Sequence, residues 1–231
     1  PENIGGAGLN HLDFALVERE LGRGSMALTH FFGRPQNILM ACKDEQIEKY
    51  LLPAVRGELM DALAMTEPDA GSDVRGMKCF AKSEGTDWIV NGTKHFISGA
   101  EHADFVIVFI ATGEEKTPKG PKKKITAFLV DRGMPGFVIR DGYNSVSHKG
   151  YKNMILEFDD CRLPKEQVLG DVNGGFEVMN TWLYATRLTV AAMSVGRARR
   201  CFDYALNYSA ERKQFGQQIG KFQGVSFQLA D

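Results

Sequence analysis

The first 62 residues carry the hydrophobic spacing of helices. Leu9, Leu12 and Leu16 recur at i, i+3 and i+7. This spacing predicts an amphipathic helix that ends at Gly22. Asp44 can cap a second helix that Pro53 ends or kinks, with an inner face formed by Ile47, Tyr50 and Leu51. The segment between the two helices, 26–40, is mostly apolar and is expected to be buried.

From about residue 63 to residue 168 the spacing changes to the alternation of strands. Trp88 to Val90 runs into Asn91-Gly92, a dipeptide typical of tight hairpins, so we expect a turn there and a returning strand from Thr93 to Ser98. Lys116 to Lys124 reads as a solvated loop. Short connections favour antiparallel pairing in a small barrel or sandwich, with further strands over 105–111, 125–130, 137–140 and 154–158.

Helical spacing returns at Gly174-Gly175 and continues to about Arg212, which predicts a helix of roughly 35 residues and about 50 Å. Gly216 to Gly220 then forms a turn, and a further helix begins near Phe222. The predicted fold class is therefore α+β. The chain divides into a helical block over 1–62, a β block over 63–168 and a second helical block over 169–231.

Composition narrows the function classes. The 231 residues are 43% hydrophobic and 25% charged, with a net charge of −1, so there is no basic excess to bind nucleic acid or an anionic membrane. No apolar run is long enough to span a bilayer, and Pro1-Glu2-Asn3 does not open a signal peptide, so secretion is not expected. The histidines show no metal-ligand spacing. Reduced, structural thiols are expected at Cys42, Cys79, Cys161 and Cys201.

The segment from Ala64 to Asp73 follows a mostly apolar entry and concentrates residues suited to a bound anion. Pro68 fixes one backbone angle, and Gly71 lets the main chain approach a ligand closely. Thr66 and Ser72 offer hydroxyl donors beside backbone N–H groups. A polar turn after a strand is the alternative reading of this segment.

Two motifs together resemble the acyl-CoA dehydrogenase family. The first is Met-Thr-Glu-Pro-Asp-Ala-Gly-Ser-Asp over 65–73, and the second is Val-Asn-Gly-Thr-Lys-His-Phe-Ile-Ser-Gly over 90–99. The resemblance extends over nearly the whole chain and implies the family's three-part fold: part of an N-terminal helical domain over 1–62, a middle β domain over 63–168 and the start of a C-terminal helical bundle over 169–231. In that fold the second helical block also builds the oligomer. Both ends look cut, which suggests an internal portion of a longer enzyme.

The reaction implied by the resemblance is FAD-dependent α,β-dehydrogenation of an acyl-CoA thioester to a trans-2-enoyl-CoA. A carboxylate takes the α proton while the β hydrogen moves as hydride to the flavin, and electrons pass to an electron-transfer flavoprotein. An oxidase that uses oxygen and a non-catalytic, FAD-retaining binding protein are the alternatives. The resemblance also implies a homo-oligomer, dimer or tetramer, located in the cytoplasm if bacterial or the mitochondrial matrix if eukaryotic.

The resemblance assigns cofactor contacts to three stretches. The first motif supplies contacts along the flavin ring and its pyrophosphate, and Phe96 and Ser98 of the second stand against the ring face and near its N5. A third stretch reaches across a dimer interface to the neighbouring subunit's FAD. The complete set is Leu63, Ala64, Met65, Thr66, Gly71, Ser72, Phe96, Ile97, Ser98, Arg212, Gln214, Phe215, Phe222 and Gln223.

Substrate contacts are implied at Ser72, Tyr151, Tyr184, Thr186 and Arg187. Tyr151 stands where many relatives place a serine that binds coenzyme A, which leaves that contact open to question. Thr186 occupies the position at which isovaleryl and long-chain relatives carry their catalytic glutamate. Threonine cannot act as the catalytic base. We therefore expect the base, a glutamate, beyond Asp231, and no catalytic residue within this sequence. Glu67 is predicted to be structural, and Phe31 and Phe32 are candidates for the acyl-pocket wall, with a core role as the alternative.

Overall fold

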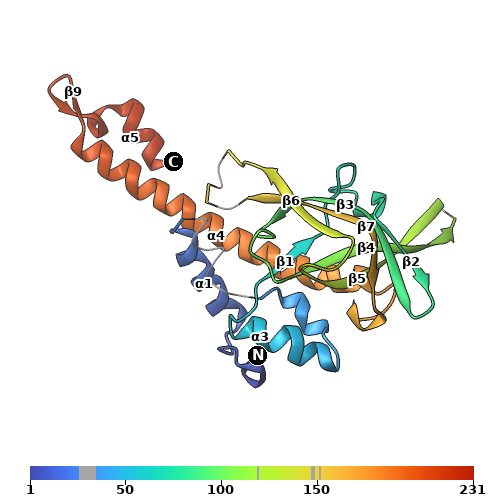
Figure 1. Ribbon diagram of the computed structural model, residues 1–231. Coiled ribbons are helices and arrows are strands. Elements are labelled where there is room, and N and C mark those ends of the chain that lie inside the picture. The colour runs from blue at the N-terminus through green and yellow to red at the C-terminus, as the bar shows by residue number, and fades with distance from the viewer. Residues whose placement is uncertain (26–34, 119, 147–148, 151) are drawn as a thin grey trace. The chain divides into compact units, whose positions relative to one another are not determined.

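The computed structural model describes residues 1–25, 35–118, 120–146, 149–150 and 152–231. Its helices are α1 (His11–Gly22), α3 (Leu52–Val55), α4 (Gly175–Glu211) and α5 (Gln223–Ala230), with a π-helical turn over Ile47–Leu51 and 3₁₀ turns over Glu2–Ile4, Asn37–Ala41, Val74–Gly76, Lys165–Gln167 and Ile219–Lys221 (Figure 1). By packing, the chain forms two compact units, one of residues 1–8 and 30–185 and one of residues 9–29 and 186–231. The division into three domains stays a prediction.

The first unit is built on a curled sheet (Figure 1). Its strands run in the order β6-β7-β3-β2-β4-β5-β8, and β1 pairs with β4. Most neighbours are antiparallel, as predicted, but β1 and β2 pair with β4 in parallel. The strands are β1 (Asp61–Ala64), β2 (Phe80–Glu84), β3 (Asp87–Ser98), β4 (Phe105–Thr117), β5 (Gly120–Asp131), β6 (Phe137–Tyr143), β7 (Asn153–Leu163) and β8 (Val168–Leu169).

Two hydrophobic clusters cover the two faces of this sheet. Alternate residues of β4 enter opposite clusters, because successive side chains of a strand point to opposite faces. Val106, Val108 and Ile110 enter one cluster. Phe105, Ile107 and Phe109 enter the other, where the first turns of α4 and the π-helical turn also pack. The buried strand predicted at 105–111 is therefore confirmed.

The hairpin predicted at Asn91-Gly92 is wrong. Strand β3 runs straight through both residues, and the turn between β2 and β3 lies at Gly85 and Thr86. Gly92 has φ +137°, and a Cβ at this position would lie 2.6 Å from the Cα of Cys79. Glycine is required there for close approach of two backbones, which a local turn signal does not distinguish from a turn.

The loop predicted over Lys116 to Lys124 is also mostly wrong. Strands β4 and β5 extend into it and pair as far as Thr117 and Gly120, so that a long two-stranded arm replaces the loop. Glu115 lies opposite Lys122 in the register, and the ammonium group of the next lysine, Lys123, donates to the carbonyl oxygen of Met77. Opposite charges across an antiparallel pair favour continued pairing, which explains why this polar sequence stays extended.

The helix predicted after Asp44 forms, but with altered geometry near Pro53. The five residues before α3 adopt a π-helical turn, and Tyr50 and Leu51 are buried as expected. Asp44 has φ +47° and provides no side-chain cap; Gln46 precedes the π turn. A proline within a helix removes a backbone donor and crowds the preceding turn, which accounts for the wider turn before it.

The second unit contains α1, the C-terminal part of α4, α5 and a short hairpin of β9 (Lys213–Gln214) and β10 (Gln217–Gln218). The predicted helices at 9–21 and 175–212 are confirmed. Helices α1 and α4 approach closely at two glycines, since a Cβ at Gly22 would overlap the main chain of Met193 and one at Gly196 would overlap the carbonyl oxygen of Arg19. Arg23 forms a 3.1 Å ion pair with Asp203 nearby.

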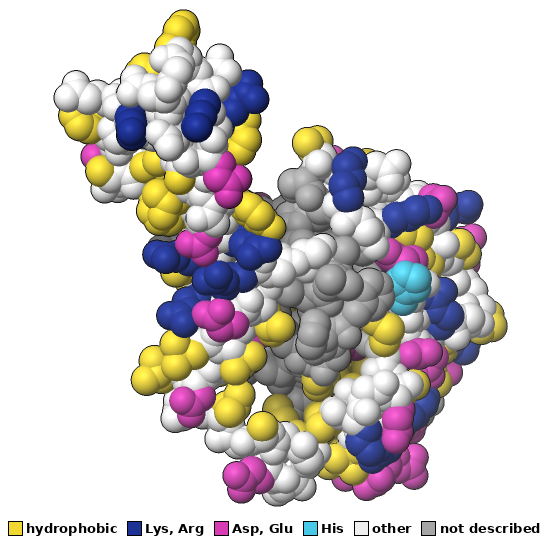
Figure 2. Space-filling model, turned by 90° about the vertical axis from the view of Figure 1, so that its left-hand side faces the viewer, with side chains coloured by type: hydrophobic (Ala, Val, Ile, Leu, Met, Phe, Trp, Pro, Cys, Tyr) yellow, Lys and Arg dark blue, Asp and Glu magenta, His cyan; other side chains and the backbone are white. Residues whose placement is uncertain are grey.

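Hydrophobic side chains of α4 and α5 lie exposed at the surface among charges of both signs (Figure 2). They include Val190, Val195, Tyr204, Tyr208 and Phe227. Within the described residues, no helix is both long and apolar enough to cross a membrane.

We predict that Gly196→Ala destabilises the second unit. The added methyl group collides with backbone that cannot move without separating α1 from α4, and overpacking of this kind costs about 1–3 kcal/mol. Thermal unfolding of the purified protein measures the effect. Gly224→Ala in α5 is the matched control, because in the part of the chain that the structure describes no atom lies within 4 Å of the new Cβ. An unfolding temperature for Gly196→Ala equal to that of the control would contradict the close helix crossing.

Asp61, at the start of β1, carries a partly buried carboxyl group. Its Oδ2 accepts a hydrogen bond from the backbone N–H of Gln36 at 3.0 Å, and the Gln36 side chain in turn accepts one from the indole of Trp182 at 2.6 Å. Burial raises the pKa of the Asp61 carboxyl from 3.8 to about 6. The folded state therefore binds this proton more tightly than the unfolded state does, and stability falls as pH rises from about 4 through about 6.

Replacing Asp61 with asparagine keeps an acceptor for Gln36 but removes the buried charge. We expect Asp61→Asn to increase the free energy of unfolding by about 1–3 kcal/mol at pH 7 and to change it little at pH 4. Urea denaturation at the two pH values measures this difference. Asp104→Asn is the control, because the exposed Asp104 accepts a similar bond from the N–H of Met60. The same stabilisation at both pH values would refute the assignment.

Candidate functional site

The two sequence motifs meet in the first unit. The first occupies the loop that directly follows β1, and the second lies almost entirely on β3. The backbone N–H of His95 donates to the carbonyl oxygen of Thr66 at 2.9 Å. The ammonium group of Lys94 donates to the carbonyl oxygen of Met65 at 3.2 Å and to the carboxylate of Glu67 at 2.6 Å. Residues some 30 positions apart thus form one site.

The loop of the first motif presents donors that the protein does not use. Among the described residues, neither the hydroxyl nor the backbone N–H of Thr66 has a hydrogen-bond partner, although Thr66 is partly buried. Gly71 and Ser72 are exposed, and no atom of the described ranges lies within 4 Å of the position a Cβ of Gly71 would take. Free donors beside open backbone suit a ligand with an acceptor edge and a phosphate group.

A β-bulge on β3 sets the direction of the second motif. Lys94 pairs with Leu156 and Ile97 with Met154, so His95 and Phe96 together oppose a single residue of β7. Phe96 takes the left-handed conformation with φ +58°, which is strained for a residue with a side chain. The bulge buries Ile97 and leaves half of the Phe96 side chain exposed.

The exposed Phe96 ring packs against two other aromatic rings. It lies 4.1 Å from the ring of His95 and 4.4 Å from that of Tyr143, measured between centroids, and the Tyr143 hydroxyl lies 3.3 Å from Nδ1 of His95. The Ser98 hydroxyl donates to the side-chain oxygen of Asn153 at 2.9 Å. These contacts give the site a supported aromatic face and a fixed hydroxyl.

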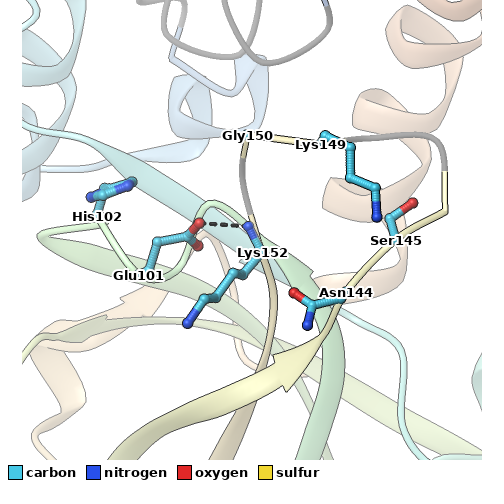
Figure 3. Close-up of a pocket in the computed structure, with 7 residues that line it drawn as sticks. All are labelled: Glu101, His102, Asn144, Ser145, Lys149, Gly150 and Lys152. Atoms are coloured by element: carbon cyan, nitrogen blue, oxygen red, sulfur yellow. Dashed lines mark hydrogen bonds between the residues drawn. The ribbon is translucent and has the colours of Figure 1, made fainter.

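A cavity of about 490 Å³ opens where β3 and β6 end and β7 begins (Figure 3). Its lining joins the residues after β3 with those between β6 and β7: Glu101, His102, Asn144, Ser145, Lys149, Gly150 and Lys152. The Glu101 carboxylate accepts the backbone N–H of Lys152 at 2.7 Å, and the Lys152 ammonium pairs with Asp141 at 2.9 Å. The cavity therefore offers cationic and polar groups directly beyond Ser98 and Asn153.

The remaining predicted contacts fall in different places. Leu63 and Met65 are partly buried beside Thr66, whereas Ala64 is fully buried, so Ala64 can meet a ligand only through its main chain. Tyr151, Phe31 and Phe32 lie outside the described residues. Tyr184, Thr186 and Arg187 lie on α4, with Tyr184 and Arg187 exposed and Thr186 partly exposed.

The third predicted stretch follows α4 in the second unit. Phe215, at the tip of the hairpin β9–β10, is 94% exposed and has φ +51°. Its ring meets that of Phe222 edge-on at 6.1 Å. Arg212, Gln214 and Gln223 are exposed. An aromatic side chain held outward on strained backbone is typical of a contact surface.

Sequence reasoning missed Lys94, Tyr143 and Asn153. A signal existed for Lys94, because Val90, Gly92 and Lys94 alternate on the inward face of β3. A lysine at an inward position requires a buried anion, and Glu67 supplies it. Tyr143 and Asn153 gave no local signal, since each acts through a neighbouring strand.

The arrangement fits a flavin. Thr66 offers free donors to an acceptor edge, Phe96 a supported flat surface, Ser98 a hydroxyl, and the open backbone at Gly71 and Ser72 room for a pyrophosphate. These are the features needed to hold and orient a planar redox cofactor without a lysine on its phosphates.

Comparison with known proteins gives the same result. Residues 1–58, 62–161 and 173–231 match the models for the N-terminal, middle and C-terminal domains of acyl-CoA dehydrogenase. The chain is 36% identical to mitochondrial isovaleryl-CoA dehydrogenase from Pongo abelii, over all of this chain and 55% of that protein. It is 35% identical to the caffeyl-CoA reductase-Etf complex subunit CarC from Acetobacterium woodii, again over the whole chain and 61% of the relative.

Among solved structures, the FAD complex of PigA matches with a TM-score of 0.89 and 30% identity, over all of this chain and 61% of that one. The chain thus spans between about half and two thirds of the length of the proteins it matches. Family models, relatives and fold agree over nearly every residue. The chain therefore belongs to the acyl-CoA dehydrogenase family, whose members are FAD flavoproteins.

Proposed function

We propose that the protein to which this chain belongs catalyses FAD-dependent α,β-dehydrogenation of an acyl-CoA thioester to a trans-2-enoyl-CoA. The observation that carries the proposal is that hydrogen bonds connect the first motif, after β1, to the second motif on β3. The carbonyls of Met65 and Thr66 accept bonds from Lys94 and His95 of β3, and the Thr66 donors have no partner among the described residues. Phe96, next to His95 in the strand, has a ring supported by Tyr143. When bound, FAD supplies the hydride-accepting chemistry that no side chain possesses.

The residues of the site hold and orient the cofactor. The Thr66 N–H and hydroxyl would bond the polar edge of the ring, and Leu63, Ala64 and Met65 would line it. Phe96 would pack against the ring and exclude water, and Ser98, fixed by Asn153, would contribute a hydroxyl group. Gly71 and Ser72 would accommodate the pyrophosphate.

The carboxylate that removes the α proton lies elsewhere in the protein. Glu67 is unsuited to that role, because its side chain is 3% exposed and already accepts bonds from Lys94 and two backbone N–H groups. Thr186 carries no carboxylate. We infer that the base comes from beyond Asp231, with Tyr184, Thr186 and Arg187 of α4 contacting substrate.

The cavity at the ends of β3, β6 and β7 supports coenzyme A as the acyl carrier. Lys149 and His102 offer cationic or donor groups, as the phosphates of a nucleotide require, and Tyr151 lies between Lys149 and Lys152 in sequence. We infer that Tyr151 and Ser72 contribute to this binding.

We further infer that Arg212, Gln214, Phe215, Phe222 and Gln223 contact the FAD of a neighbouring subunit in a homo-oligomer. The 94% exposure of Phe215 supports a contact outside its own unit. Electrons are proposed to leave through an electron-transfer flavoprotein, as the name of the Acetobacterium woodii relative suggests. The compartment is proposed to be the cytoplasm in a bacterium or the mitochondrial matrix in a eukaryote.

Anaerobic titration of the full-length enzyme with a panel of acyl-CoA thioesters tests the proposal. We expect one chain class to bleach the visible absorbance of the oxidised flavin. Bleaching followed by rapid reoxidation in air would favour an oxidase, which is the alternative reaction. A yellow enzyme that no thioester bleaches would instead indicate a non-catalytic, FAD-retaining binding protein. A colourless protein that binds no added FAD would refute the cofactor assignment.

Thr66→Val tests the free donor. The substitution removes a hydroxyl that has no partner among the described residues, so we expect FAD to bind about tenfold more weakly, a loss of about 1.4 kcal/mol, while the free energy of unfolding of the apoprotein stays unchanged. Thr112→Val is the matched control, because the Thr112 hydroxyl bonds Thr126 and Asn173 at 2.8 and 2.9 Å. It should lower stability and leave FAD affinity intact. Equal FAD affinities in Thr66→Val and wild type would remove Thr66 from the site.

A further inference from the structure

Glu67 and Lys94 form a buried ion pair behind the proposed flavin site. The exposed fraction of their side chains is 3% and 0%, and Nζ of Lys94 lies 2.6 Å from Oε1 of Glu67. Buried charges are strongly unfavourable unless they are paired and hydrogen-bonded. The groups that hydrogen-bond to this buried pair are therefore held in fixed positions.

The carboxylate of Glu67 also binds backbone groups. Its Oε2 accepts the N–H of Lys78 at 2.5 Å and that of Cys79 at 3.1 Å. The loop between Glu67 and Ala70 is closed by a 2.8 Å bond from the N–H of Glu67 to the carbonyl of Ala70. One side chain thus connects the loop after β1 to the segment that enters β2.

The ammonium group of Lys94 makes the contact that bears on the ligand. Besides Glu67, it binds the carbonyl oxygen of Met65 at 3.2 Å. That carbonyl shares a planar trans peptide with the N–H of Thr66, so the two groups point in opposite directions. By holding the Met65 oxygen inward, Lys94 turns the Thr66 N–H outward, where no described residue accepts from it.

We propose that Glu67 and Lys94 are positioning residues that orient the Met65-Thr66 peptide, and thereby its N–H donor, toward the acceptor edge of the flavin. The proposal rests on the proposed function, because it assumes that FAD binds at this loop. It assigns the pair no contact with the flavin or substrate. A hydrogen bond from a preorganised donor is gained at full strength, because the loop does not have to be ordered on binding.

A pair that only stabilises the fold would behave differently, and two variants separate the two roles. Lys94→Met leaves the Glu67 carboxylate buried without its counterion, so both stability and FAD binding should suffer. Adding Glu67→Gln removes that charge yet keeps a carbonyl acceptor for the N–H groups of Lys78 and Cys79. The double variant therefore regains stability, but it still lacks the donor that holds the Met65 oxygen.

The experiment is titration of the full-length apoprotein with FAD, followed by flavin fluorescence and by the visible spectrum of the bound form. We expect Lys94→Met and the double variant both to bind FAD at least tenfold more weakly than wild type, with a less structured visible band. The double variant should nevertheless unfold at a urea concentration close to that of wild type. Glu67→Gln with Lys94→Leu repeats the test with another apolar side chain if the first double variant does not fold.

Lys78→Met is the control. It breaks the exposed 2.5 Å pair between Lys78 and Asp69 beside the same loop, and both FAD affinity and the flavin spectrum should match wild type. Recovery of wild-type FAD affinity together with stability in the double variant would overturn the positioning role. Failure of the wild-type protein itself to bind FAD would refute the proposed function instead.

Discussion

The hydrogen bonds that connect the loop after β1 to strand β3 are the constraint on which the site depends. Lys94 holds the Met65 carbonyl and the Glu67 carboxylate, and the adjacent N–H of His95 holds the carbonyl of Thr66. Because these acceptors are satisfied inside the protein, the donors of Thr66 remain available for a ligand. The chemistry of the loop therefore follows from contacts on its inner side.

The bulge on β3 provides the other half of the geometry. His95 and Phe96 oppose a single residue on β7, so the alternation of side chains shifts by one residue. Lys94 and Ile97 are therefore both buried. Phe96 is displaced outward as a result, and its unfavourable φ is supported by ring contacts with His95 and Tyr143. Without the bulge, strict alternation would place Ile97 on the opposite face from Lys94 and move it out of the core.

Glycine serves close packing in both units of the chain. Gly92 allows β3 to approach Cys79, which carries one of the N–H groups bound by Glu67. Gly22 and Gly196 allow α1 and α4 to touch through their backbones. At each of these glycines an added methyl group would collide with main-chain atoms, which move far less easily than the atoms of a flexible side chain. The positions of the site's strands and of the two helices thus depend on the absence of a Cβ.

The sequence by itself determined the types of most elements and pointed to the candidate site. The hydrophobic period distinguished helices from strands, because burial on one face imposes a period of 3.6 or 2 regardless of the partner. The residues of the two motifs were sufficient to indicate the family and to propose the loop around Thr66 and Ser72 as the flavin-binding one. These properties are local, so a single chain read in order contains them.

Tertiary structure decided what depended on partners distant in sequence. Asn91-Gly92 has the composition of a turn, yet Gly92 meets a neighbouring backbone, and no local rule separates the two uses. The lysine-rich segment stays extended because β4 and β5 face each other with opposite charges. Lys94 gains its role only from Glu67, 27 residues earlier, and Ser98 from Asn153, 55 residues later. Pairing energies of this kind arise between strands, and the order of residues along one strand does not specify them.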